Sequence, residues 1–398
     1  MHCNLPSCLR GLACAATLSV AGGAAAAAQA PTIQVQGRIQ VQYRASSGDS
    51  SGNYNTTLVS NGFEVRRLRI QTNVRFGDNM TLSIQPSFEM GALRMRDAFL
   101  RVGLTPNFGV TLGQEKSPFQ RYELVSSNNL LSIERGVRIL RLSGKEGLND
   151  LLTNNGYVSH DLGAFVDYAA TANRVTLKLG VSNGSRESAT DVNNAKSFFG
   201  RATAIVLSNA DDQPVLQIGG SFGARDRAVC SSAPGTTPGT CTAYFADSSK
   251  TTTAFGLDLE YGGFRPGLHV IADFATGDNV PAALRVATGR NAGNLRPNTP
   301  NDSIATFRGA SLIGAYRIMT TGADTRVVKM IEPALRVDAT DPNTNVDGDG
   351  GLLITPVLNV YFGNTVVLRA GFDIYRYKDA AGASQSAREV KVSWQANF

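Results

Sequence analysis

The sequence lacks most of the features on which enzymes and helical membrane proteins depend. It contains three histidines and one tryptophan, and charged residues make up 18% of it, below the roughly 25% usual in soluble proteins. We find no zinc-ligand spacing, no phosphate-binding glycine loop and no nucleotide motif, so the sequence predicts neither a metal nor a cofactor. The net charge of +6 is small and dispersed along the chain, which argues against nucleic acid as a partner.

Only one long apolar segment is present, and it lies near the N-terminus. Residues 12–30 follow Arg10 and contain no charge, which is the plan of a secretory signal peptide. We expect a signal peptide over residues 1–28, because a cut after Ala30 would place Pro31 next to the scissile bond. A transmembrane anchor is the alternative, but the run is rich in Ala and Gly and falls short of about 20 strongly apolar residues.

Cysteines are also scarce, and three of the five lie in this leader. Cys230 and Cys241 remain in the exported chain. Because export leads to an oxidising compartment, we expect these two residues to form a disulfide that closes a small loop. Two unpaired thiols are the alternative.

What the sequence does contain is alternation of apolar and polar residues. In the final stretch, VKVSWQANF, Val390, Val392, Trp394, Ala396 and Phe398 share one parity and the polar residues share the other. Successive side chains of a strand point to opposite faces, so this segment is predicted to be a strand with one apolar face. Sixteen segments show this character: 32–44, 62–76, 79–90, 92–104, 107–115, 160–168, 174–183, 197–208, 214–224, 252–261, 267–276, 304–318, 326–339, 352–362, 365–377 and 388–398. Parity is unclear in 92–104 and 304–318, where we expect a β-bulge.

The connections between these segments alternate between long and short. Long ones, such as 116–159 and 225–251, follow the odd-numbered strands except the third, and short turns follow the even-numbered strands. This alternation is typical of an up-and-down barrel in an outer membrane. We therefore predict an all-β fold over residues 29–398, a 16-stranded antiparallel transmembrane β-barrel whose apolar face meets outer-membrane lipid. A barrel of this size leaves an aqueous channel.

One segment identifies a family. GQEKSPFQRYELVSSNNLLSIERG, residues 113–136, resembles the phosphate-selective porin O and P family, as do GFEVRRLRI at 62–70 and RDAFLRVG at 96–103. The resemblance covers the first half of the chain. It implies an outer-membrane porin of a Gram-negative bacterium, a homotrimer with an inward-folded third loop that narrows the pore. It also implies anion preference, with phosphate or polyphosphate as solute. The terminal Phe398 resembles the final aromatic residue of outer-membrane barrels, and we expect the barrel-assembly machinery to read it.

The charges around the third loop agree with anion preference. Five basic residues and two acidic ones, Glu123 and Glu134, give a net charge of +3, and the strand at 62–76 adds three arginines on the inward parity. Rings of Arg and Lys make pores anion-selective. The candidate constriction and anion path therefore comprises Lys116, Arg121, Arg135, Arg138, Arg141, Arg67, Arg69 and Arg75. Ten acids on the inward parity nearly balance the wall, so a general non-selective or cation-leaning porin is the alternative.

Three rival interpretations carry less support. An outer-membrane hydrolase would need a base beside its nucleophile, and His160 and His269 lie near no nucleophile motif; we therefore expect no enzymatic activity. The loops 225–251 and 277–303 are long enough for an adhesin, but their Thr, Asn and Pro content favours solvated loops. DPNTNVDGDG, residues 341–350, has the ligand spacing of a calcium loop, yet Val346 and Leu352 replace the required Gly and Glu, which favours a polar turn.

Overall fold

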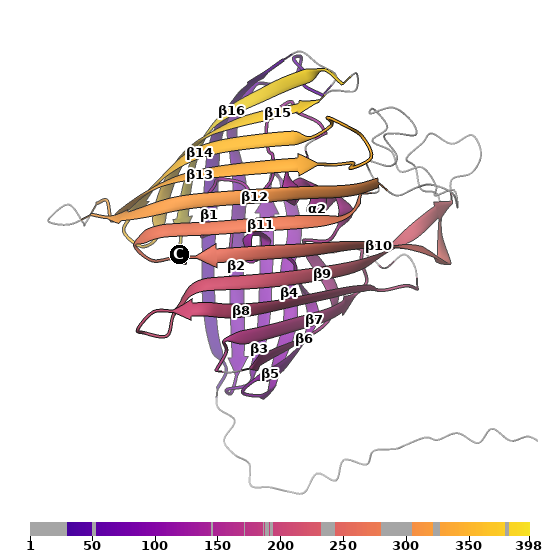
Figure 1. Ribbon diagram of the computed structural model, residues 1–398. Helices are drawn as coiled ribbons and strands as arrows, with labels where there is room; N and C mark the ends of the chain where they lie inside the picture. Colours follow the sequence, from indigo (N-terminus) through magenta and orange to yellow (C-terminus); the bar gives the residue numbers. More distant parts are fainter. Residues whose placement is uncertain are drawn as a thin grey trace, which may run out of the picture.

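The chain folds into a closed β-barrel, seen here in a computed structural model (Figure 1). The structure describes residues 30–49, 53–144, 146–170, 172–185, 187, 191, 194–231, 243–279, 305–320, 327–378 and 382–398. The predicted signal peptide and the predicted Cys230–Cys241 disulfide lie outside what it describes. Within the described residues, sixteen strands run antiparallel to their chain neighbours, and β1 pairs with β16 to close the sheet.

The strands and the two described helices have the following bounds. They are β1 (Thr32–Gly48), β2 (Asn61–Phe76), β3 (Met80–Glu89), β4 (Ala92–Thr105), β5 (Phe108–Lys116), α1 (Arg121–Leu124), α2 (Leu148–Asn155), β6 (His160–Ala170), β7 (Val175–Ser182), β8 (Ser197–Ser208), β9 (Pro214–Ser231), β10 (Ala243–Tyr261), β11 (Gly267–Asn279), β12 (Ala305–Met319), β13 (Met330–Asp341), β14 (Gly351–Phe362), β15 (Val366–Lys378) and β16 (Ser384–Asn397). Neither described helix is long and apolar enough to cross a membrane. All sixteen predicted strands are confirmed, although β10 begins nine residues earlier than the alternation indicated.

The chain end takes part in closing the barrel. The backbone N–H of Phe398 donates to the carbonyl of Gly37 at 2.9 Å, and the Gly37 N–H donates back at 2.7 Å. A Cβ at position 37 would lie 2.4 Å from the Phe398 ring. A larger residue at this position of β1 would therefore displace the terminal aromatic ring that lies over the seam between first and last strand.

The barrel has the two faces that the alternation predicted. Polar side chains such as Gln42, Arg336 and Glu389 are buried inside, whereas Leu257, Leu312 and other large apolar side chains are exposed on the outside. The pairing of β3 with β4 shifts register between Ile84 and Pro86, which confirms the bulge expected in 92–104.

The bulge expected in 304–318 was wrong. Strand β12 pairs with β11 and β13 without a register shift. The parity of this segment is unclear in the sequence because its inward face carries Phe307, Ile313 and Ala315, all buried. These apolar side chains face the third loop instead of water.

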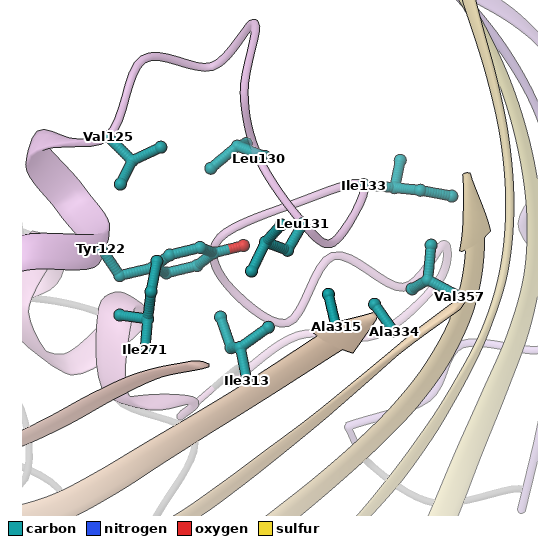
Figure 2. Packing of buried hydrophobic residues seen from close by; sticks show 10 residues of the cluster. All are labelled: Tyr122, Val125, Leu130, Leu131, Ile133, Ile271, Ile313, Ala315, Ala334 and Val357. Atoms are coloured by element: carbon teal, nitrogen blue, oxygen red, sulfur yellow. The ribbon is translucent and has the colours of Figure 1, made fainter. Parts of the chain in front are cut away.

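The third loop, residues 117–159 between β5 and β6, folds into the barrel as predicted and contains both helices. Figure 2 shows side chains of this loop pointing toward the inner wall of the barrel. Tyr122, Val125, Leu130, Leu131 and Ile133 of the loop form one cluster with Ile271, Ile313, Ala315, Ala334 and Val357 of β11 to β14. Leu131 is fully buried there, and each such side chain contributes about 1.5–3 kcal/mol through burial.

Candidate pore constriction

Polar contacts fix the third loop against the wall formed by β9 to β14. The backbone N–H of Gln120 donates to Ser221 Oγ at 3.1 Å, and its side chain donates to the carbonyl of Phe274 at 3.1 Å. Further along the loop, Asn359 Nδ2 donates to the carbonyl of Leu131 at 3.0 Å. Together with the apolar cluster, these bonds hold the loop in one position inside the lumen.

The tip of the loop is held by three arginines of β15, β1 and β2, on the part of the barrel that continues the wall beyond β14. Arg69 of β2 donates to Ser127 Oγ at 3.2 Å, and Arg369 of β15 donates to the carbonyl of Asn128 at 3.0 Å. Arg38 of β1 donates to Asn128 Oδ1. The loop therefore follows the wall from β9 round to β2, which leaves only part of the lumen open beside it.

Glu134 anchors the middle of the loop to β1 and β2. Its carboxylate accepts from Arg66 Nε and Arg67 Nη2, both at 2.7 Å, from Gln42 Nε2 at 3.1 Å and from Arg138 Nη1 at 3.2 Å. Burial alone would raise the pKa of Glu134, but the positive charges of Arg66 and Arg67 outweigh it and hold that pKa well below its ordinary range.

Arg66 reaches the Glu134 carboxylate because β2 carries a bulge at this residue. Gln40 of β1 faces Arg67 and the next residue, Val41, faces Val65, so Arg66 is the additional residue. Strict alternation places Arg66 on the lipid side. In the sequence, an arginine among the apolar residues of the outward face was therefore the sign of this bulge.

Arg135 belongs to a group of four cations that we call the Arg135 cluster: Arg38, Arg69, Lys116 and Arg135. Each of the other three lies within electrostatic reach of Arg135. Two carboxylates oppose these four cations. Glu89 accepts from Arg69 Nε at 2.8 Å, and Glu123 lies 3.3 Å from Lys116 Nζ and 3.5 Å from Arg135 Nε. Four positive charges minus two negative charges leave a net +2 at this point.

The guanidinium of Arg135 is held by the loop itself. Arg135 Nε donates to the carbonyl of Tyr122 at 3.3 Å, and Nη2 donates to the carbonyl of Val125. No described residue accepts from its Nη1. Arg38 is 5% exposed, forms no ion pair with any described residue, and keeps its Nε without a partner. These two guanidinium groups therefore retain N–H donors that protein acceptors do not use.

Four other residues of the predicted constriction lie outside the Arg135 cluster, each with its own partner. Arg121 pairs with Glu260 of β10, and Arg138 pairs with Glu64 at 3.0 Å as well as with Glu134. Arg67 belongs to the Glu134 contact described above. Arg141 lies over the ring of Tyr54 at 6.0 Å.

Arg75 is exposed at the short-turn end of β2 and is not brought to the third loop. Its exposed position comes from its place next to the last residue of the strand, beyond Arg69, which contacts the loop. Of the eight predicted residues, the cluster therefore gathers Lys116, Arg69 and Arg135, and it adds Arg38, which the prediction did not include.

Elsewhere on the inner wall, acids and bases neutralise one another. Most of the other acids on the inward parity are paired with nearby cations: Glu115 with Lys178 at 2.7 Å, Asp167 with Arg101, Asp258 with Arg201, Glu332 with Arg317, Asp338 with Arg336 and Asp373 with Lys391. Asp273 instead accepts from the backbone N–H of Tyr122 at 3.3 Å. The positive excess is consequently concentrated around Arg135.

The residues considered for other chemistry have structural partners. His160 Nε2 lies 3.2 Å from Asp97, and His269 Nε2 lies 3.0 Å from Glu260. In the segment 341–350, Asp341 and Asn343 each accept the backbone N–H two residues ahead at 3.2 Å. This geometry is that of consecutive Asx turns.

An apolar outer face, a polar lumen and a loop that narrows it define the chain as an outer-membrane porin. Residues 33–226 match the family model described as phosphate-selective porin O and P. The match covers just under half of the chain, and the recognised motif at 113–136 lies within it. A search of curated proteins gave no match.

Solved porin structures share the fold at low sequence identity. The anion-selective porin from Comamonas acidovorans is 10% identical with a TM-score of 0.58, and the match covers 92% of this chain and 100% of that one. The outer membrane channel DcaP of Acinetobacter baumannii is 12% identical with a TM-score of 0.56, covering 92% and 97%. OmpT of Vibrio cholerae, in a trimer form, is 12% identical with a TM-score of 0.55, covering 93% and 100%.

Proposed function

We propose that this porin conducts small solutes by passive diffusion and prefers anions, phosphate or polyphosphate among them. The observation that carries the proposal is the Arg135 cluster, in which four cations oppose two carboxylates beside the third loop. Arginine and lysine at a constriction attract anions and repel cations. The anion-selective porin from Comamonas acidovorans, which has the same fold, supports this preference.

Phosphate fits the donors that the cluster leaves available. Arg135 Nη1 is a guanidinium N–H group without an acceptor among the described residues, and guanidinium groups bind phosphate oxygens through short, charge-assisted bonds. Of the predicted path, Arg67, Arg121, Arg138 and Arg141 support the loop that presents the cluster, and Arg75 lies at the exposed end of β2.

The proposal includes the remaining features of an exported porin. We propose that residues 1–28 are removed on export and that the barrel-assembly machinery reads the terminal Phe398. We also propose that the mature barrel, surrounded by outer-membrane lipid, forms a homotrimer. The trimer form of the structurally similar OmpT supports this assembly. No chemical conversion of the solute is part of the proposed function.

Planar-bilayer recording tests the function. The protein reconstituted into a bilayer under a KCl gradient is expected to give a zero-current potential with the sign of chloride permeability. Phosphate added at micromolar concentration is expected to block part of the chloride current. A cation-selective potential would overturn anion preference, whereas a chloride-selective channel that phosphate does not block would remove phosphate alone from the proposal.

A further inference from the structure

Beside the Arg135 cluster, the luminal wall contains a groove that simple anion conduction does not require. The groove has a volume of about 450 Å³ and lies between β4 to β8 and the beginning of the third loop. Phe99, Pro118 and Leu124 contribute apolar side chains to it. Phe99 stands on the inward parity of β4, between Asp97 and Arg101, and is partly exposed.

Most charges that line the groove are already compensated. Lys178 pairs with Glu115 at 2.7 Å, Arg201 pairs with Asp258, and Asp167 pairs with Arg101. Asp97 lies 3.2 Å from His160 Nε2, and that imidazole compensates its charge only when it is protonated. Lys116 differs because its carboxylate partner, Glu123, is shared with Arg135. The groove therefore combines an apolar surface with one cation at its edge that is only partly neutralised.

We infer that this groove binds small organic carboxylates that carry an apolar part, with benzoate as the representative of the class. This inference rests on the proposed channel function and specifies a class of solute for it. The carboxylate is placed at Lys116, and the ring is placed against Phe99 and Leu124. Covering apolar surface is favourable in proportion to its area, and aromatic pairs add a contribution of their own.

This arrangement is expected to bind organic anions that carry an apolar part more tightly than inorganic anions. Chloride and phosphate gain the attraction of Lys116 but nothing from Phe99, Pro118 and Leu124. Acetate has the charge of benzoate without its ring. Partial burial of a phenyl ring corresponds to roughly a tenfold change in affinity, so benzoate is expected to block chloride current at about one tenth of the concentration that acetate requires.

The experiment compares block of chloride current by benzoate, acetate and phosphate in bilayers that contain the whole protein. Phe99→Thr keeps a residue suited to a strand and removes the ring, and Leu124→Asn removes an apolar side chain from the loop independently. Each is expected to reduce block by benzoate severalfold toward that by acetate, with block by acetate as the internal reference. Phe99→Leu, which keeps an apolar side chain, is expected to retain most of the preference.

Two results would overturn the inference: equal block by benzoate and acetate in the unaltered protein, or an unaltered preference for benzoate in both Phe99→Thr and Leu124→Asn. Neither result affects the zero-current potential. A cation-selective potential, by contrast, would contradict the proposed function itself, so the two failures can be distinguished.

Discussion

The buried carboxylate of Glu134 allows the sharpest test of how the third loop is held. Glu134→Gln keeps the size of the side chain but removes the charge that opposes Arg66 and Arg67, each 2.7 Å away. Removing one partner of a buried ion pair typically costs about 3–5 kcal/mol, because the other charge stays buried without compensation. Arg66 also lies 3.6 Å from Glu89, so we expect the lower end of this range, about 3 kcal/mol.

The assay for this prediction is the stability of the refolded barrel in urea, read by the mobility shift between folded and unfolded forms on a gel. Asp212→Asn is the matched control, because Asp212 pairs with Arg174 at 2.9 Å in an exposed position. Exposed pairs contribute about 0–1 kcal/mol. If Glu134→Gln lowered the free energy of unfolding no more than Asp212→Asn, our account of Glu134 as the anchor of the loop would be wrong.

Three further predictions follow from the same contacts. Leu131→Ala should destabilise the barrel by about 2–5 kcal/mol through loss of buried contacts, and single-channel recordings should show added noise as the loop loosens; a quiet, equally stable channel would contradict this. Arg38→Gln should lower anion selectivity with only a small loss of stability, because the lost bond to Asn128 is one of several at the loop tip and Arg38 has no ion pair among the described residues; a large loss of stability would show that its charge is structurally required. Because its pKa is held below the ordinary range, Glu134 should stabilise the loop above the ordinary carboxyl pKa of about 4.3 and lose this effect only in strongly acidic solution; noise that rises already at pH 5 would contradict the assignment.

The strands could be predicted from the sequence because two solvents impose the pattern. Lipid outside and water inside select apolar and polar residues alternately, so a segment such as VKVSWQANF contains the information for its own two faces. The pattern fails where a third environment intervenes. Phe307 and Ile313 point inward yet are buried beneath the third loop, and only the folded loop reveals why.

The candidate site could be predicted only in part. The net charge of the loop was visible in the sequence, as were Lys116, Arg69 and Arg135. The sequence does not show which cations of the loop are neutralised, because their partners lie on distant strands. Arg121, for example, is neutralised by Glu260 of β10. Arg66 was missed because a bulge reverses its face, and Arg38 was missed as a site residue because its partner Asn128 lies 90 positions away.

The central claim is that the Arg135 cluster makes the channel prefer anions, and the zero-current potential of Arg135→Gln tests it most directly. One unit charge about 8 Å from the ion path contributes about 0.5 kcal/mol in water-like surroundings, or roughly a twofold change in relative permeability. We predict that Arg135→Gln lowers the permeability of chloride relative to potassium by about this factor, while Arg174→Gln, which alters an exposed pair away from the loop, leaves it unchanged. An equal potential in the unaltered protein and Arg135→Gln would contradict the account.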